Sequence, residues 1–103
     1  MMQRWLTLSG GIRLQHEWIT DMPTVMRVGR FRFFFYANEN DEPRHVHVKA
    51  AENEAKYWLN PLEMSWNQGY NTRELKQIER HLQDNLDYLI ETWDEFFGVI
   101  GDD

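Results

Sequence analysis

Two segments near the middle of the chain alternate between apolar and polar residues, as half-buried β-strands do. Residues 30–36 and 45–50 carry this alternation, and their apolar members are Phe31, Phe33, Phe35, Val46, Val48 and Ala50. Successive side chains of a strand point to opposite faces of a sheet, so we expect these residues to share the core side. The other side then presents an outward-facing set that is basic and aromatic: Arg30, Arg32, Phe34, Tyr36, His45, His47 and Lys49.

Two further segments complete a predicted meander. Residues 24–28 are rich in β-branched side chains and end at Gly29, and residues 54–59 alternate before Asn60 and Pro61. Residues 38–43 consist of turn-forming and acidic side chains, so they predict the connection between the two central strands. Residues 62–66 fit either a short strand or a helical turn.

The C-terminal third predicts a helix. Its large apolar residues recur at spacings of three and four, namely Leu75, Ile78, Leu82, Leu86, Leu89, Trp93, Phe96 and Phe97. Asn71 is a good N-cap, Glu74 follows three residues later as in a capping box, and Gly98 is a suitable stop. The pattern predicts one long helix whose apolar stripe covers the core side of the sheet.

Together these elements predict an α+β domain, an antiparallel β-meander of about four strands with a long C-terminal helix packed on one face. We assign residues 22–103 to this single domain and residues 1–21 to an N-terminal extension. Apolar residues alternate on either side of residues 9–11 in that extension, which favours an added strand or a hairpin. The alternative is a segment placed before an original start at Met22.

Composition and charge narrow the class of protein. The chain has 103 residues, 42% of them hydrophobic, and no cysteine, which excludes a disulfide framework, thiolate metal sites and cysteine nucleophiles. Neither a membrane span nor a signal peptide is visible, so we expect a cytoplasmic protein that does not contact membrane. Residues 1–50 carry a net charge of +2 and residues 51–103 a net charge of −8, which permits local contact with RNA or a charged protein.

His45 and His47 stand two residues apart on a predicted strand, so both imidazoles face one way, as a metal-binding pair requires. Zinc or iron needs a third ligand, and the candidates are Glu39, Asp41, Glu54, His16 and His81. A divalent metal is the one cofactor that the sequence suggests.

A second interpretation of the same residues is acid–base chemistry on a phosphodiester. His45 and His47 would act as acid and base, Arg32 and Lys49 would contact phosphate, and an aromatic ring of Tyr36 or Phe34 would stack a base. The third interpretation is an outer sheet face without chemistry, which holds a partner protein.

Several motifs occur in order that resemble one family of small bacterial proteins. They are residues 22–27, residues 32–39, the Pro-Arg-His-Val-His-Val run from Pro43 to Val48, residues 55–61 and residues 71–79. The family is catalogued as domain of unknown function 4160, and the resemblance covers Met22 to about Phe97. Members are often encoded beside a second small domain, a layout similar to toxin–antitoxin pairs, which implies a cognate small protein partner.

The leading functional hypothesis is therefore one component of a two-protein, toxin–antitoxin-like module that binds a partner and cleaves or binds RNA through the His/Arg/aromatic face. The candidate catalytic residues are His45, His47, Arg32, Tyr36 and Lys49. The alternatives are a metal-dependent activity at His45 and His47, and a non-catalytic adaptor. The sequence leaves open whether the protein is an enzyme.

Overall fold

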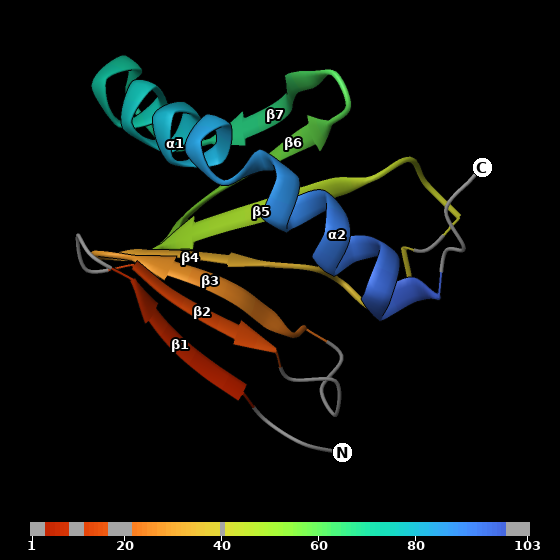
Figure 1. Ribbon diagram of the computed structural model, residues 1–103. Helices are drawn as coiled ribbons and strands as arrows, with labels where there is room; N and C mark the ends of the chain where they lie inside the picture. The colour runs from red at the N-terminus through yellow and green to blue at the C-terminus, as the bar shows by residue number, and fades with distance from the viewer. Residues whose placement is uncertain (1–3, 9–11, 17–21, 40, 99–103) are drawn as a thin grey trace.

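The computed structural model describes residues 4–8, 12–16, 22–39 and 41–98, and for the first two ranges it describes backbone pairing only. It contains one antiparallel sheet in which every strand pairs with its neighbour in the chain, in the order β1 to β7 (Figure 1). The strands are β1 (Arg4–Leu8), β2 (Ile12–His16), β3 (Thr24–Val28), β4 (Phe31–Phe34), β5 (His45–Ala50), β6 (Asn53–Leu59) and β7 (Leu62–Gln68). The α+β class and the meander are confirmed.

The sheet is longer than the sequence suggested. Residues 62–68 form β7 rather than a helical turn, and β1 and β2 extend the sheet from β3 in the other direction. The predicted turn at residues 9–11 lies outside the described residues. The strand predicted from Arg30 to Tyr36 ends at Phe34.

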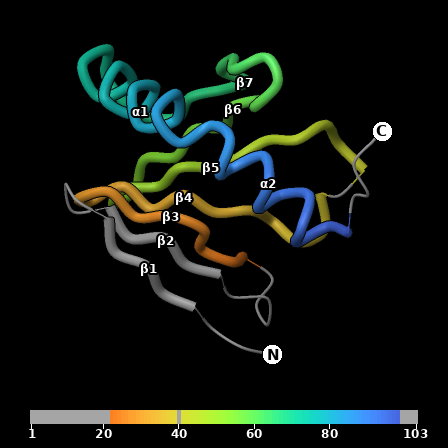
Figure 2. Tube along the Cα trace, in the orientation of Figure 1, coloured from red at the N-terminus to blue at the C-terminus, as the bar shows by residue number. Residues whose placement is uncertain are grey.

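Two helices cover one face of the sheet, α1 (Thr72–Asp84) and α2 (Leu86–Phe97). Figure 2 shows them following one another along the same side of β4, β5 and β6. The predicted core side is confirmed, because the helix residues Ile78, Leu82, Leu89 and Trp93 pack in one cluster with Phe31, Phe33, Phe35, Val46 and Val48. Burial of such large apolar side chains stabilises the fold by roughly 1.5–3 kcal/mol each.

The prediction of one uninterrupted helix was wrong, because the helix breaks at Asn85. The Asn85 side-chain amide donates to the His81 carbonyl, which the Asn85 backbone N–H would reach in a continuous helix, and that N–H instead meets the Leu82 carbonyl. The predicted capping box is present, since Asn71 accepts from the Glu74 N–H and Glu74 accepts from the Asn71 N–H.

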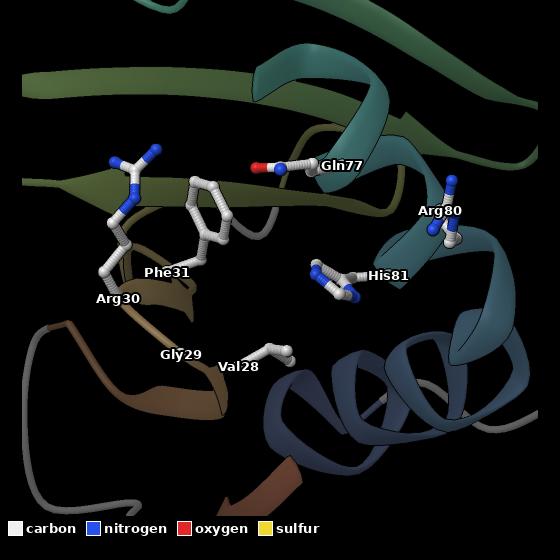
Figure 3. A pocket seen from close by; sticks show the side chains of 7 residues that line it. All are labelled: Val28, Gly29, Arg30, Phe31, Gln77, Arg80 and His81. Atoms are coloured by element: carbon white, nitrogen blue, oxygen red, sulfur yellow. The ribbon is translucent and has the colours of Figure 1, made fainter. Parts of the chain in front are cut away.

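A hollow lies between α1 and the turn that joins β3 to β4 (Figure 3). Phe31 and Val28 line it from the sheet, and Gln77, Arg80 and His81 line it from the helix. No helix in the described part of the chain is long and apolar enough to cross a membrane.

Candidate metal centre

Strand β5 holds both predicted histidines on the sheet face opposite the helices, as the alternation required. Their exposure, however, was predicted wrongly: His45 is 0% exposed and His47 is 2% exposed. Phe34, the cross-strand neighbour of His47, is fully buried as well, and its ring stacks on the His47 ring at a centroid distance of 5.6 Å. The outer face around these residues is therefore covered.

The cover is the loop between β4 and β5. Two backbone hydrogen bonds fold it, from the Glu39 N–H to the Tyr36 carbonyl and from the Glu42 N–H to the Glu39 carbonyl. These turns bring the Glu39 carboxylate over the histidines and the Glu42 carboxylate to Lys56, which lies 2.5 Å from Glu42 Oε1. Acidic side chains that a turn usually leaves in solvent thus lie on the sheet.

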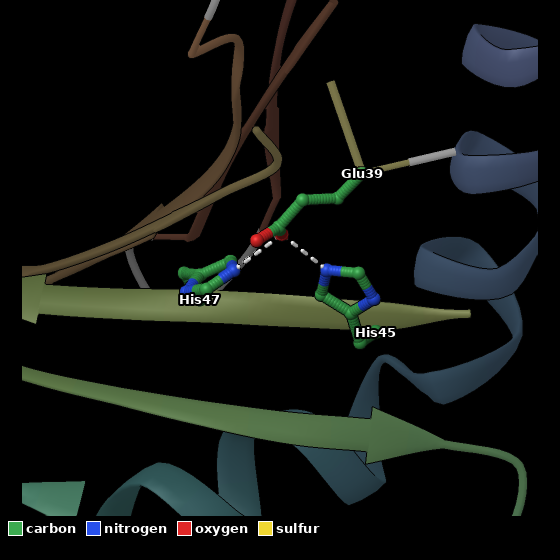
Figure 4. A group of neighbouring side chains, drawn as sticks. All are labelled: Glu39, His45 and His47. Carbon is green, nitrogen blue, oxygen red and sulfur yellow. Dashed lines mark hydrogen bonds and ion pairs between the residues drawn. The ribbon is translucent and has the colours of Figure 1, made fainter. Parts of the chain in front are cut away.

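Glu39, His45 and His47 converge on one point (Figure 4). Glu39 Oε1 lies 2.6 Å from His45 Nε2 and 2.9 Å from His47 Nε2. One donor atom from each of the three residues lies within 4.8 Å of the others. Two imidazoles and one carboxylate are a donor set that zinc and ferrous iron both accept in proteins.

The other nitrogen of each ring also faces oxygen. His45 Nδ1 lies 2.8 Å from the Pro43 carbonyl oxygen, which can only accept a hydrogen bond. His47 Nδ1 lies 3.2 Å from Glu54 Oε2, although the two are not aligned for a hydrogen bond and this buried nitrogen has no hydrogen-bond partner. The His45 contact is typical of a metal-ligating histidine, which directs its remote N–H at a carbonyl or carboxylate.

The two histidine rings have fewer N–H groups than the oxygen atoms around them could accept. Each neutral imidazole has one N–H, yet all four ring nitrogens of His45 and His47 face oxygen acceptors. Burial lowers the pKa of His47, which outweighs the opposing influence of Glu39 and keeps the ring neutral at pH 7. A ring with its proton on Nε2 donates a hydrogen bond to Glu39. A ring with its proton on Nδ1 instead points an Nε2 lone pair at the carboxylate oxygen, an arrangement that a cation between the two atoms would stabilise.

The Glu39 carboxyl is ionised in this setting. Its burial raises the pKa, but hydrogen bonds from His47 and His45 together outweigh that effect and lower the pKa below its ordinary value. Glu39 therefore offers a cation one negative charge, and the neutral His47 ring offers it a nitrogen.

The remaining candidate catalytic residues surround the cluster without joining it. Tyr36 packs edge-on against the His47 ring at 4.5 Å and donates to Glu54, and its burial beside Glu54 raises its pKa. Arg32 donates to Thr24 Oγ1 and to the Met22 carbonyl, with its guanidinium 4.5 Å from the Phe34 ring centroid. Lys49 lies opposite Arg32 in the β4–β5 register.

The candidates for a third metal ligand differ in their distance from His45 and His47. Glu39 is in place, and Glu54 lies on the far side of the His47 ring, where it acts as an outer partner. Asp41 is exposed, and His81 lies on α1 against Phe31, away from the cluster. His16 ends β2, and its side chain lies outside the described residues.

Several contacts of the site carry no signal in the sequence. Trp93 of α2 lies 4.8 Å from the His45 ring although it belongs to the helical layer, and Trp58 lies 5.6 Å from the same ring. Arg44, one residue before β5, forms two hydrogen bonds to Asp94 of α2 at 2.5 and 3.0 Å. Only the folded arrangement reveals that β5 begins where the two layers meet.

Comparison with protein-family models assigns the chain to a family. The model of the domain of unknown function DUF4160 matches residues 31–94. The chain belongs to this family. The DUF4160 match runs from β4 into α2, so it contains Glu39, His45 and His47 together with Trp93 and Asp94. No curated protein and no solved structure matches the chain.

Proposed function

We propose that this DUF4160 domain binds one divalent metal ion through Glu39, His45 and His47 and is a metal-dependent domain. The observation that carries the proposal is the convergence of two buried imidazole Nε2 atoms on one carboxylate oxygen. A bound cation would receive both lone pairs and the carboxylate charge. Both Nδ1 atoms would then keep their protons for Pro43 and Glu54.

The donor set suits a reactive centre better than a purely structural one. Structural zinc sites usually have four protein ligands, whereas catalytic sites have three and keep a position for water or substrate. Glu39 is 24% exposed in its side chain, so solvent reaches the carboxylate from the loop side of the cluster. A hollow lined by Met22, Tyr36, Ala37 and Asn38 lies along the same loop.

Isothermal titration with zinc and with ferrous iron under anaerobic conditions tests the proposal. The wild-type chain, first treated with a chelator, is expected to bind one ion, and Glu39→Gln and His47→Gln are expected to weaken binding at least tenfold. His81→Gln removes an imidazole outside the cluster and serves as the matched control. X-ray absorption of the loaded protein should report two imidazole ligands.

Two results would overturn the metal proposal. One is the absence of binding by a folded wild-type protein. The other is equal binding by Glu39→Gln and His81→Gln, since the ion would then lie elsewhere. In either case Glu39 would serve only to hold its loop on the sheet through hydrogen bonds.

A protein partner is a second candidate function, and one observation favours it. Strand β7 is an edge of the sheet, its residues 63–68 are exposed, and Met64 and Trp66 are 43% and 38% exposed. Edge strands with exposed apolar side chains are prone to pair with another chain. This surface supports the proposed two-protein, toxin–antitoxin-like module.

Induced expression in a bacterial host tests the toxin part of that proposal. Growth arrest by the wild-type chain, relieved in a folded Glu39→Gln variant and absent from an empty vector, would support a toxin that depends on the cluster. Normal growth with abundant folded protein would contradict it.

A further inference from the structure

Cationic residues occupy one row that crosses three strands of the sheet. The register pairs Arg27 of β3 with Arg32 of β4, and Arg32 with Lys49 of β5. Neighbouring strands lie about 4.8 Å apart, so the three positions span about 10 Å. We call these three residues the cation row.

The cation row is unexpected on electrostatic grounds. Like charges directly opposite one another on neighbouring strands destabilise a sheet, and the chain as a whole carries a net charge of −6. Arg27 is exposed and Lys49 is half-buried, and neither forms an ion pair with any residue that the structure describes. Arg32, which lies between them in the register, donates to Thr24 Oγ1 and to the Met22 carbonyl.

Exposed and half-buried rings lie around His47, one same-face step along β5 from Lys49. Lys49 follows His47 by two residues on the same face of β5, a step of about 7 Å. The Tyr36 ring lies 4.5 Å and the Trp66 ring 5.8 Å from His47, and Trp66 is 38% exposed. Proteins hold single strands with cations that contact the phosphates and nearby aromatic rings that stack the bases.

We propose that the cation row binds the phosphate backbone of a single-stranded nucleic acid and places it beside the Glu39, His45 and His47 cluster. As an assignment of substrate class this rests on the proposed metal centre, but the binding itself does not require metal. A row of charges about 10 Å long suits successive phosphates better than one small anion.

Fluorescence anisotropy tests the row with labelled single strands of RNA and DNA of about 12 nucleotides. Measurements contain a chelator, so that a failed metal site does not affect them, and they run from about 50 to about 200 mM salt. The test variant is Arg27→Gln/Lys49→Gln. The control is Lys76→Gln/Arg80→Gln on α1, which removes the same charge from the helical side, and poly-glutamate serves as an anion without bases.

We expect the wild-type chain to bind a single strand, with the control variant unchanged and Arg27→Gln/Lys49→Gln at least tenfold weaker. The slope of log affinity against log salt should decrease in magnitude by about 1.4, since each lost phosphate contact contributes about 0.7 for single strands. Urea unfolding of the test variant checks that it is folded, so that a loss of affinity does not reflect a loss of structure.

The proposal is overturned if neither RNA nor DNA binds the wild-type chain at the lower salt concentration. It is also overturned if the α1 variant loses as much affinity as the row variant, or if poly-glutamate competes as well as the oligonucleotides. Binding without metal uptake would refute the metal centre alone. Metal uptake without binding would refute the cation row alone.

Discussion

Replacing Glu39 with glutamine removes the charge on which the cluster converges and keeps the shape of the side chain. Without a metal ion, the Glu39 carboxylate lies 2.6 Å from the His45 ring and 2.9 Å from the His47 ring. Both rings are at most 3% exposed, and the Glu39 side chain is 24% exposed. Hydrogen bonds to a charged group contribute about 1.5–3 kcal/mol each. The glutamine carbonyl oxygen can still accept both hydrogen bonds, but as neutral bonds worth about 0.5–1.5 kcal/mol each, so we expect a net loss of about 2–3 kcal/mol in the free energy of unfolding. For a domain of this size each kcal/mol lowers Tm by roughly 4–8 °C.

Urea unfolding followed by tryptophan fluorescence measures this loss. Measurements with and without zinc separate the role of Glu39 in holding the loop from its role in binding metal. Glu52→Gln is the control, because it makes the same charge change at an exposed turn position. Zinc at about one hundred times its Kd should stabilise the wild type and Glu52→Gln by about 2.7 kcal/mol and Glu39→Gln by much less. If Glu39→Gln and Glu52→Gln have the same free energy of unfolding in chelator, the Glu39 carboxylate does not hold the loop. If zinc shifts both variants equally, the metal does not bind at Glu39.

Three further predictions concern the helical layer, each followed by urea unfolding. Asn71→Ala should lower stability by about 1 kcal/mol, because it removes the side-chain oxygen that accepts a hydrogen bond from the Glu74 N–H. Asn71→Ser should retain most of the wild-type stability, because serine is also a good N-cap. Leu82→Ala, at a fully buried position, should lower stability by about 2–5 kcal/mol, and a smaller loss would mean that the helices pack loosely on the sheet. Burial lowers the pKa of His81 from 6.5, with Asp84 opposing and Arg80 reinforcing the shift. Below pH 6.5 the unfolded chain therefore binds a proton that the folded protein excludes, and the stability of the wild type should fall with decreasing pH more steeply than that of His81→Gln.

The fold could be predicted from local pattern wherever the pattern itself determines the structure. Period-two alternation placed Phe33 and Val48 on the core side correctly, because a strand leaves its side chains no other choice. The helix break escaped the same reasoning, since Leu82, Leu86 and Leu89 continue the apolar spacing through Asn85 without interruption. What ends α1 is a hydrogen bond from the Asn85 side chain to the backbone, and spacing does not record it.

Alternation also assigned His45 and His47 to the correct face of the sheet, but it does not predict whether that face is exposed to solvent. Burial there depends on the loop that follows β4, and its acidic residues predict a solvent-exposed turn when they are read alone. Glu39 was one of several third-ligand candidates, and no pattern in the sequence favoured it over Asp41. The difference arises from two turn hydrogen bonds that direct Glu39 inward, while Asp41 remains exposed.

The burial of the histidines changes which chemistry the site favours. Acid–base catalysis by two exposed imidazoles would need each ring to exchange protons with substrate and solvent. Here His45 is enclosed by Glu39, the Pro43 carbonyl and the rings of Trp58 and Trp93, so both of its nitrogens are already occupied. A ring fixed at Nδ1 and aimed at a carboxylate through Nε2 has the geometry of a ligand. Because Trp93 belongs to α2, and Arg44 binds Asp94 of the same helix, the helical layer positions this ligand as firmly as the sheet does. The cluster is thus built into the fold at the point where β5 meets α2, which is the rigidity that a metal centre requires.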